Sequence, residues 1–184
     1  MGYGLSAAVI LIALISIHGN NFRGILALFL SLSFIQFIYS IQKKEKEFVA
    51  EIFGAAAIGL TSSMILVCAG WPLKEALIIW GVLSVRTGTS IFFVRYKLKK
   101  NNEWFNSALS VGIVQFIGLL ALAALVYQAH SYWGILIGYF VLAARALYGI
   151  SPLAKTARAK TIGIREIFYG LFNCICIIVS FSKF

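Results

Sequence analysis

Residues 105–127 read FNSALSVGIVQFIGLLALAALVY, an uncharged stretch in which apolar side chains predominate. A helix that crosses the hydrocarbon core of a bilayer needs about 20 predominantly apolar residues. The stretch does not alternate between apolar and polar residues, so it favours a helix over a strand of a membrane barrel. This segment therefore predicts a transmembrane helix.

Six other apolar segments of the chain predict the same structure. They lie near residues 3–17, 24–41, 48–69, 73–94, 132–150 and 162–181. Seven such segments leave only short connections, so no soluble domain is expected. The sequence predicts an all-α protein, a polytopic transmembrane bundle of about seven spans in which residues 1–184 form a single domain.

The composition excludes several classes of protein. Hydrophobic residues make up 61% of the chain and charged residues only 12%, whereas a soluble domain has about 25% charged residues. A soluble enzyme, a disordered chain and a secreted disulfide scaffold are therefore ruled out. The three cysteines, Cys68, Cys174 and Cys176, all lie inside apolar segments and are interpreted as buried thiols.

Positive charge is concentrated in alternate connections between the predicted spans. Most of the 16 lysines and arginines lie in residues 42–47, 95–100 and 151–165. Under the positive-inside rule these connections face the cytoplasm. In a bacterial cytoplasmic membrane, this places the amino terminus on the cytoplasmic side and the carboxyl terminus on the outer side. This topology accounts for the net charge of +10 without nucleic acid. Membrane lipids, anionic ones included, are the expected partners.

Ionisable residues inside the predicted spans are the main functional signal. An arginine at the centre of a spanning helix costs about 2.5–3.5 kcal/mol on insertion scales, and such groups usually face the protein interior. The candidates all fall in the predicted cytoplasmic half, and they are Glu51, Arg86, Arg145, Arg165 and Glu166.

Small residues suggest which way these side chains point. At helical spacing, Gly134 and Gly138 share a face with Arg145, and small residues allow close helix packing in lipid. Glu166 shares a stripe with Gly170, Asn173 and Ser180, which also indicates an inward face. Gly54 lies near the face of Glu51 in the same way.

Three interpretations of the five residues remain open. They form an ion-pair network that clamps the bundle, with each glutamate bound to an arginine. Alternatively, the three arginines form an anion pocket that opens to the cytoplasm, oriented by the two glutamates, since guanidinium groups suit phosphate and carboxylate. A proton or ion relay through the glutamates is the third interpretation.

No catalytic, metal-binding or cofactor-binding motif is recognisable. Aspartate is absent from the chain, and His18 and His130 lie in predicted turns without nearby carboxylates or thiolates. We therefore expect a protein that is not an enzyme and that holds no metal or cofactor.

Three stretches of the sequence resemble the YwiC-like family of bacterial integral membrane proteins. They are residues 43–54, where a basic loop runs into the helix of Glu51, residues 84–99 around Arg86, and residues 162–167 around Arg165. The family pattern opens with a His-Gly-Ala element ahead of further helices, whereas here His18-Gly19 follows a helix. The resemblance therefore implies a chain shortened at its amino terminus, and it implies no particular biochemical activity.

The YwiC-like family is loosely similar to UbiA-type prenyltransferases, which hold a prenyl diphosphate through Mg²⁺ on Asp-rich motifs. Because this chain has no aspartate, that resemblance implies a fold that has lost the metal motifs. A secondary transporter and a structural subunit of a membrane complex are the other functions considered. The preferred hypothesis is a membrane protein that binds an anionic lipid headgroup or a small anion from the cytoplasmic side.

Overall fold

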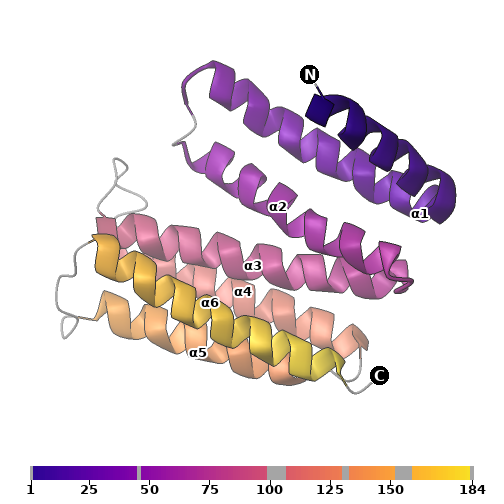
Figure 1. The fold of residues 1–184 in the computed structure, drawn as a ribbon. Helices are drawn as coiled ribbons and strands as arrows, with labels where there is room; N and C mark the ends of the chain where they lie inside the picture. Colours follow the sequence, from indigo (N-terminus) through magenta and orange to yellow (C-terminus); the bar gives the residue numbers. More distant parts are fainter. Residues whose placement is uncertain (1, 45–46, 99–106, 130–132, 152–158, 183–184) are drawn as a thin grey trace. The chain divides into compact units, whose positions relative to one another are not determined.

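The computed structural model describes residues 2–44, 47–98, 107–129, 133–151 and 159–182. These residues form the helices α1 (Gly2–Ile41), α2 (Phe48–Cys68), α3 (Leu73–Leu98), α4 (Ala108–Ala129), α5 (Trp133–Ile150) and α6 (Ala159–Phe181) (Figure 1). No strand occurs in this part of the chain. The predicted all-α fold is confirmed.

Six helices within the described residues are long and apolar enough to cross a membrane, close to the predicted number of about seven. The first of them begins at Phe22, inside α1. Residues 3–17, predicted as a separate span, form the first part of α1, before the kink at Gly19 at which two helices meet. At 1.5 Å rise per residue this first part is only about 22 Å long, shorter than the roughly 30 Å hydrocarbon core.

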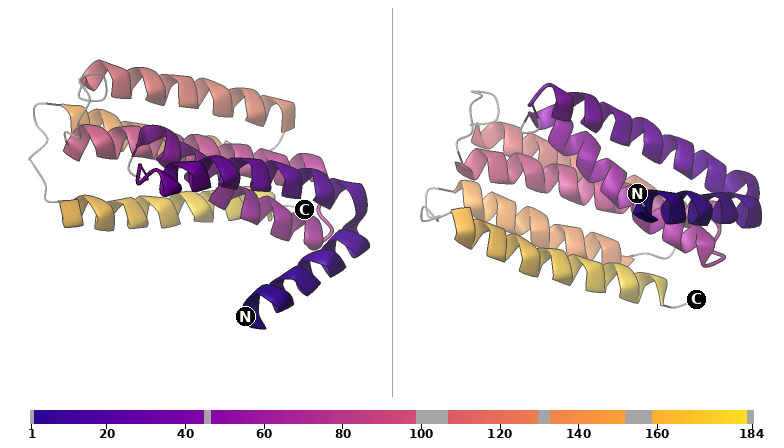
Figure 2. Two further views of the ribbon diagram at one scale, coloured as in Figure 1. Left: turned by 90° about the horizontal axis from the view of Figure 1, so that it is seen from above. Right: turned by 45° about the horizontal axis from the view of Figure 1, so that its top comes forward.

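A single glycine interrupts α1. Gly19 has φ 65° and ψ −147°, which lies outside the helical region, and a positive φ is accessible to glycine because it has no Cβ. Figure 2 shows the chain turning sharply where the two parts of α1 meet. The predicted turn over residues 18–24 is therefore reduced to one residue, with helix on both sides.

The chain divides into two compact units, residues 1–84 and 85–184, and α3 contributes to both. In the first unit, α1 packs along α2. The core of this unit is built from Phe22, Ile25, Leu26, Leu60, Val67 and Ala76. Trp80 in α3 donates a hydrogen bond from Nε1 to the Ala56 carbonyl of α2 at 2.9 Å, which links the two helices.

A tight turn joins α2 to α3 in the first unit. Gly70 has φ 85°, and the backbone N–H groups of Gly70 and Trp71 donate to the carbonyls of Val67 and Leu66. These bonds satisfy carbonyls that the end of α2 would otherwise leave unpaired. Pro72 then precedes α3, a position at which its missing N–H is no disadvantage.

In the second unit, α4 packs on α5 and α5 packs on α6. The α5–α6 contact is close because Gly138 has no side chain: a Cβ built there would lie 2.8 Å from Nδ2 of Asn173. Gly134 likewise contacts Ser180. The prediction that this glycine pair marks a packed face is confirmed.

The described residues are apolar on the outside and partly polar within. Thr89, Gln115 and Asn173 are buried, whereas large apolar side chains such as Phe116 and Ile167 are exposed. Exposed apolar surface of this extent is characteristic of contact with a membrane. Together with the six candidate spans, it supports a multi-pass membrane protein.

Candidate functional site: ionisable groups within the second unit

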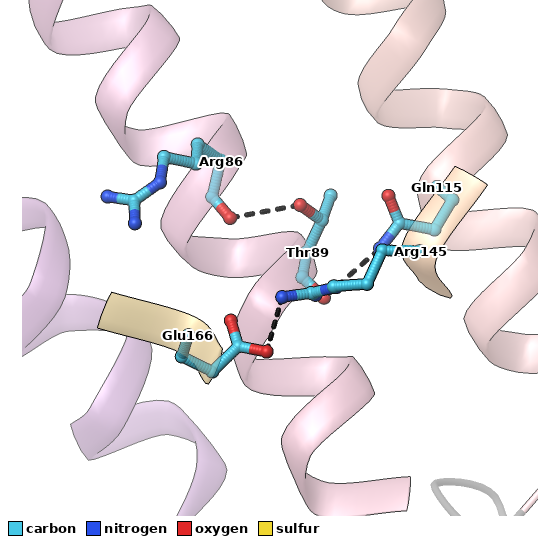
Figure 3. Close-up of polar contacts among 5 residues, drawn as sticks. All are labelled: Arg86, Thr89, Gln115, Arg145 and Glu166. Atoms are coloured by element: carbon cyan, nitrogen blue, oxygen red, sulfur yellow. Dashed lines mark hydrogen bonds and ion pairs between the residues drawn. The ribbon is translucent and has the colours of Figure 1, made fainter. Parts of the chain in front are cut away.

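An ion pair joins α5 to α6. Nη1 of Arg145 donates to Oε1 of Glu166 (Figure 3). The Arg145 side chain is 8% exposed and that of Glu166 is 19% exposed. Arg145 lies five residues before the end of α5, about 7.5 Å along the helix axis. The prediction that Arg145 points into protein, and that Glu166 faces inward, is confirmed.

Two aromatic rings hold the Arg145 guanidinium. Its Cζ lies 4.4 Å from the ring centroid of Phe93 in α3 and 5.1 Å from that of Tyr169 in α6. Each contact places a cation near the negative face of a ring. Arg145 therefore connects α3, α5 and α6, although its Nε and Nη2 atoms are buried without a hydrogen-bond partner.

Arg86 lies deeper in the second unit. It is twelve residues before the end of α3, about 18 Å along the helix axis. Its Nε is buried without a hydrogen-bond partner, and its Nη2 occupies the place that a Cβ would take at Gly170 of α6. In Figure 3 its guanidinium points away from the Arg145–Glu166 pair.

A hydrogen-bond network links α3, α4 and α5 beside these arginines. Nε2 of Gln115 donates to the Thr89 carbonyl at 3.5 Å, and the Tyr139 hydroxyl lies 3.1 Å from Oε1 of Gln115. Tyr139 is 0% exposed. Sequence reasoning missed this network, although the amide of Gln115 near the middle of the predominantly apolar segment 105–127 was a usable signal, because a polar side chain in lipid needs a partner.

Asn173 extends the polar interior along α6. It is 1% exposed and its Oδ1 has no hydrogen-bond partner. Gly170, Asn173 and Ser180 are all buried, so the predicted inward stripe that begins at Glu166 is confirmed.

The other two predicted site residues lie elsewhere. Arg165 in α6 is exposed, so it does not share the interior of Arg145 and Arg86. Glu51 is half-buried in α2 and belongs to the first unit. Of the predicted set, the structure joins Arg145 to Glu166 within the second unit, while Arg86 lies against Gly170 of the same unit and points away from that pair. His130 lies outside the described residues.

One comparison with known proteins finds a family. Residues 1–69 match the YwiC-like protein family. This match agrees with the family resemblance found in the sequence. It includes residues 43–54, one of the three stretches on which that resemblance rests. The stretches 84–99 and 162–167 lie outside the YwiC-like match. No curated protein and no solved structure matches the chain.

The YwiC-like match and the six apolar helices support the same general conclusion. The chain is a multi-pass helical membrane protein with a region of YwiC-like sequence over residues 1–69. The shortened amino terminus and the likeness to UbiA-type prenyltransferases stay predictions.

Proposed function

We propose that this chain is a non-enzymatic membrane protein that binds an anionic group at Arg86, either a lipid headgroup or a small anion, from the cytoplasmic side. The proposal rests on the position of Arg86 and on the absence of a hydrogen-bond partner for its Nε. It lies within a candidate membrane span, and its buried Nε has no hydrogen-bond partner. Buried polar groups are nearly always hydrogen-bonded, so an unpartnered guanidinium nitrogen points to a missing acceptor.

The charge of the second unit supports an anion as that acceptor. Among its described residues Glu166 is the one carboxylate side chain, and it is already bound to Arg145. The positive charge of Arg86 is therefore not compensated by Glu166. A charged arginine within a span costs about 2.5–3.5 kcal/mol near the bilayer centre, and an anion bound by the guanidinium offsets part of that cost. Phosphate and carboxylate suit the planar, two-pronged geometry of arginine.

Arg145 and Glu166 act as positioning residues in this proposal. Glu166 stands one turn before Gly170 on α6, and Gly170 is the residue against which Arg86 lies. The Arg145–Glu166 pair ties α6 to α5, and the Phe93 contact of Arg145 ties α5 to α3. Together these contacts hold α6 at the distance from α3 that the Arg86 guanidinium requires.

The test compares wild type with Arg86→Gln in detergent, by the rise in unfolding temperature on titration. One arm uses inorganic phosphate and the other a short-chain phosphatidic acid, with sodium chloride at matched ionic strength as the control. A charge-assisted hydrogen bond contributes about 1.5–3 kcal/mol, so Arg86→Gln should need roughly 10–150 times more ligand. A response to phosphatidic acid alone identifies a lipid headgroup, whereas a response to inorganic phosphate identifies a small anion.

A pair of glycine substitutions in α6 gives a matched control. A methyl group at Gly170 displaces Nη2 of Arg86, whereas a Cβ at Gly163 meets nothing within 4 Å. Gly170→Ala should weaken anion binding, and Gly163→Ala should leave it unchanged. The proposal is rejected if Arg86→Gln binds both probes as tightly as wild type.

A further inference from the structure

Two neighbouring residues of α6 point in different directions. Glu166 turns inward to Arg145, while Arg165, one residue earlier, is exposed. Successive residues of a helix are separated by about 100° of rotation, so one side chain can be paired inside while the next faces outward. Arg165 makes no salt bridge with any carboxylate among the described residues.

The exposed face around Arg165 is apolar and aromatic. Phe168 and Phe172, three and seven residues further along α6, share the face of Arg165 at helical spacing. Phe168 is 68% exposed and Phe172 is 41% exposed. Other large apolar side chains of α6 that are exposed beside them are Ile164, Ile167, Leu171 and Ile175. A face of this kind is suited to acyl chains, with the cation at one end of it.

Arg165 lies near the end of α6 at which the candidate membrane span begins. The candidate span of α6 begins at Lys160, and Arg165 lies five residues further, about 7.5 Å along the axis. An arginine at this depth can extend its guanidinium toward the membrane surface while its aliphatic part stays among apolar groups. Lys160 is also exposed and adds positive charge at the same end of α6.

We propose that Arg165, Phe168 and Phe172 form an outward-facing site for an anionic phospholipid. The guanidinium binds the phosphate in the two-pronged geometry that arginine favours, and the two phenyl rings contact the acyl chains. The occupant is a lipid because the cation is continuous with an exposed apolar face inside a membrane span. This site is separate from the proposed function of Arg86, which faces the interior.

The experiment reconstitutes the protein in nanodiscs of phosphatidylcholine that contain phosphatidylglycerol, and measures retained lipids by native mass spectrometry. Wild type should retain phosphatidylglycerol in preference to phosphatidylcholine. Arg165→Gln should reduce that preference about fivefold, the equivalent of the roughly 1 kcal/mol that one basic residue contributes near an anionic surface. Arg165→Lys keeps the positive charge but loses the two-pronged geometry of the guanidinium. Its preference for phosphatidylglycerol should therefore fall between those of wild type and Arg165→Gln.

Arg23→Gln is the matched control, since Arg23 is an exposed arginine of α1 in the first unit. It should leave the retained lipids unchanged. Replacement of both Phe168 and Phe172 by alanine should lower retention of phosphatidylglycerol and phosphatidylcholine alike. The site is refuted if Arg165→Gln retains phosphatidylglycerol as wild type does, or if Arg23→Gln loses it to the same extent. Either result leaves the Arg86 titration unaffected, so the two proposals can fail independently.

Discussion

Replacement of Glu166 by glutamine tests the ion pair that organises the second unit. Glutamine has nearly the size of glutamate but cannot neutralise Arg145, whose side chain is only 8% exposed. Removal of one member of a buried pair costs about 3–5 kcal/mol because the other charge stays buried. Glu166 is 19% exposed, so we expect the lower end of this range, about 3 kcal/mol.

The expected shift in unfolding temperature follows from this value. For a chain of 150–250 residues, each kcal/mol changes the melting temperature by about 2–4 °C. Glu166→Gln should therefore melt about 6–12 °C below wild type, measured by tryptophan fluorescence in one detergent. The double variant Arg145→Gln with Glu166→Gln removes both charges, so no unpaired charge stays buried. It should recover much of the melting temperature that Glu166→Gln alone loses, because the effects of two contacting residues are coupled.

Lys160→Gln provides the control for this measurement. It removes an exposed charge from the first turn of α6, where such substitutions usually change stability by less than about 0.5 kcal/mol. The reasoning is refuted if Glu166→Gln melts at the wild-type temperature. It is equally refuted if the double variant is less stable than Glu166→Gln alone.

Three further predictions concern packing, hydrogen bonding and topology. Gly118→Ala should destabilise the protein by about 1–3 kcal/mol in thermal unfolding because its methyl group overlaps the Tyr139 hydroxyl, whereas Gly112→Ala, with nothing within 4 Å, should not. Tyr139→Phe removes the hydroxyl that contacts Gln115 and should cost about 0.5–1.5 kcal/mol in the same assay; an unchanged melting temperature would contradict the network. Single cysteines at Lys44 and Ala69, both exposed, in a background without the three native cysteines, should react with a membrane-impermeant thiol reagent from opposite sides of the membrane; labelling from one side would overturn the predicted topology.

The helices themselves were predictable because each satisfies its backbone hydrogen bonds internally. Residues 48–68 formed a helix almost as the apolar pattern predicted, since in lipid only helices and closed barrels leave no backbone group unpaired. Local spacing also identified the inward stripe of Glu166, Gly170 and Asn173, because rotation around a helix depends only on residue number.

Which of the five predicted ionisable groups lie together could not be predicted in this way. Arg165 and Glu166 are adjacent in sequence, yet one is exposed and the other is bound to Arg145. The buried amide of Gln115 was missed for a related reason, since its partners Thr89 and Tyr139 lie on two other helices. Helical spacing shows which residues of one helix share a face, but not which helix lies opposite that face.

The amino-acid sequence alone determined that this protein is a multi-pass helical bundle, because apolar length and a low content of charged residues are properties of each segment by itself. It also indicated that Gly134 and Gly138 face a neighbouring helix. Only the tertiary structure decided that Arg145 is neutralised by Glu166, that Arg86 lies on Gly170 with an unpartnered nitrogen, and that Arg165 faces outward. The physical reason is that the energy of a charge within a membrane protein depends on the groups that surround it, and those groups come from different helices.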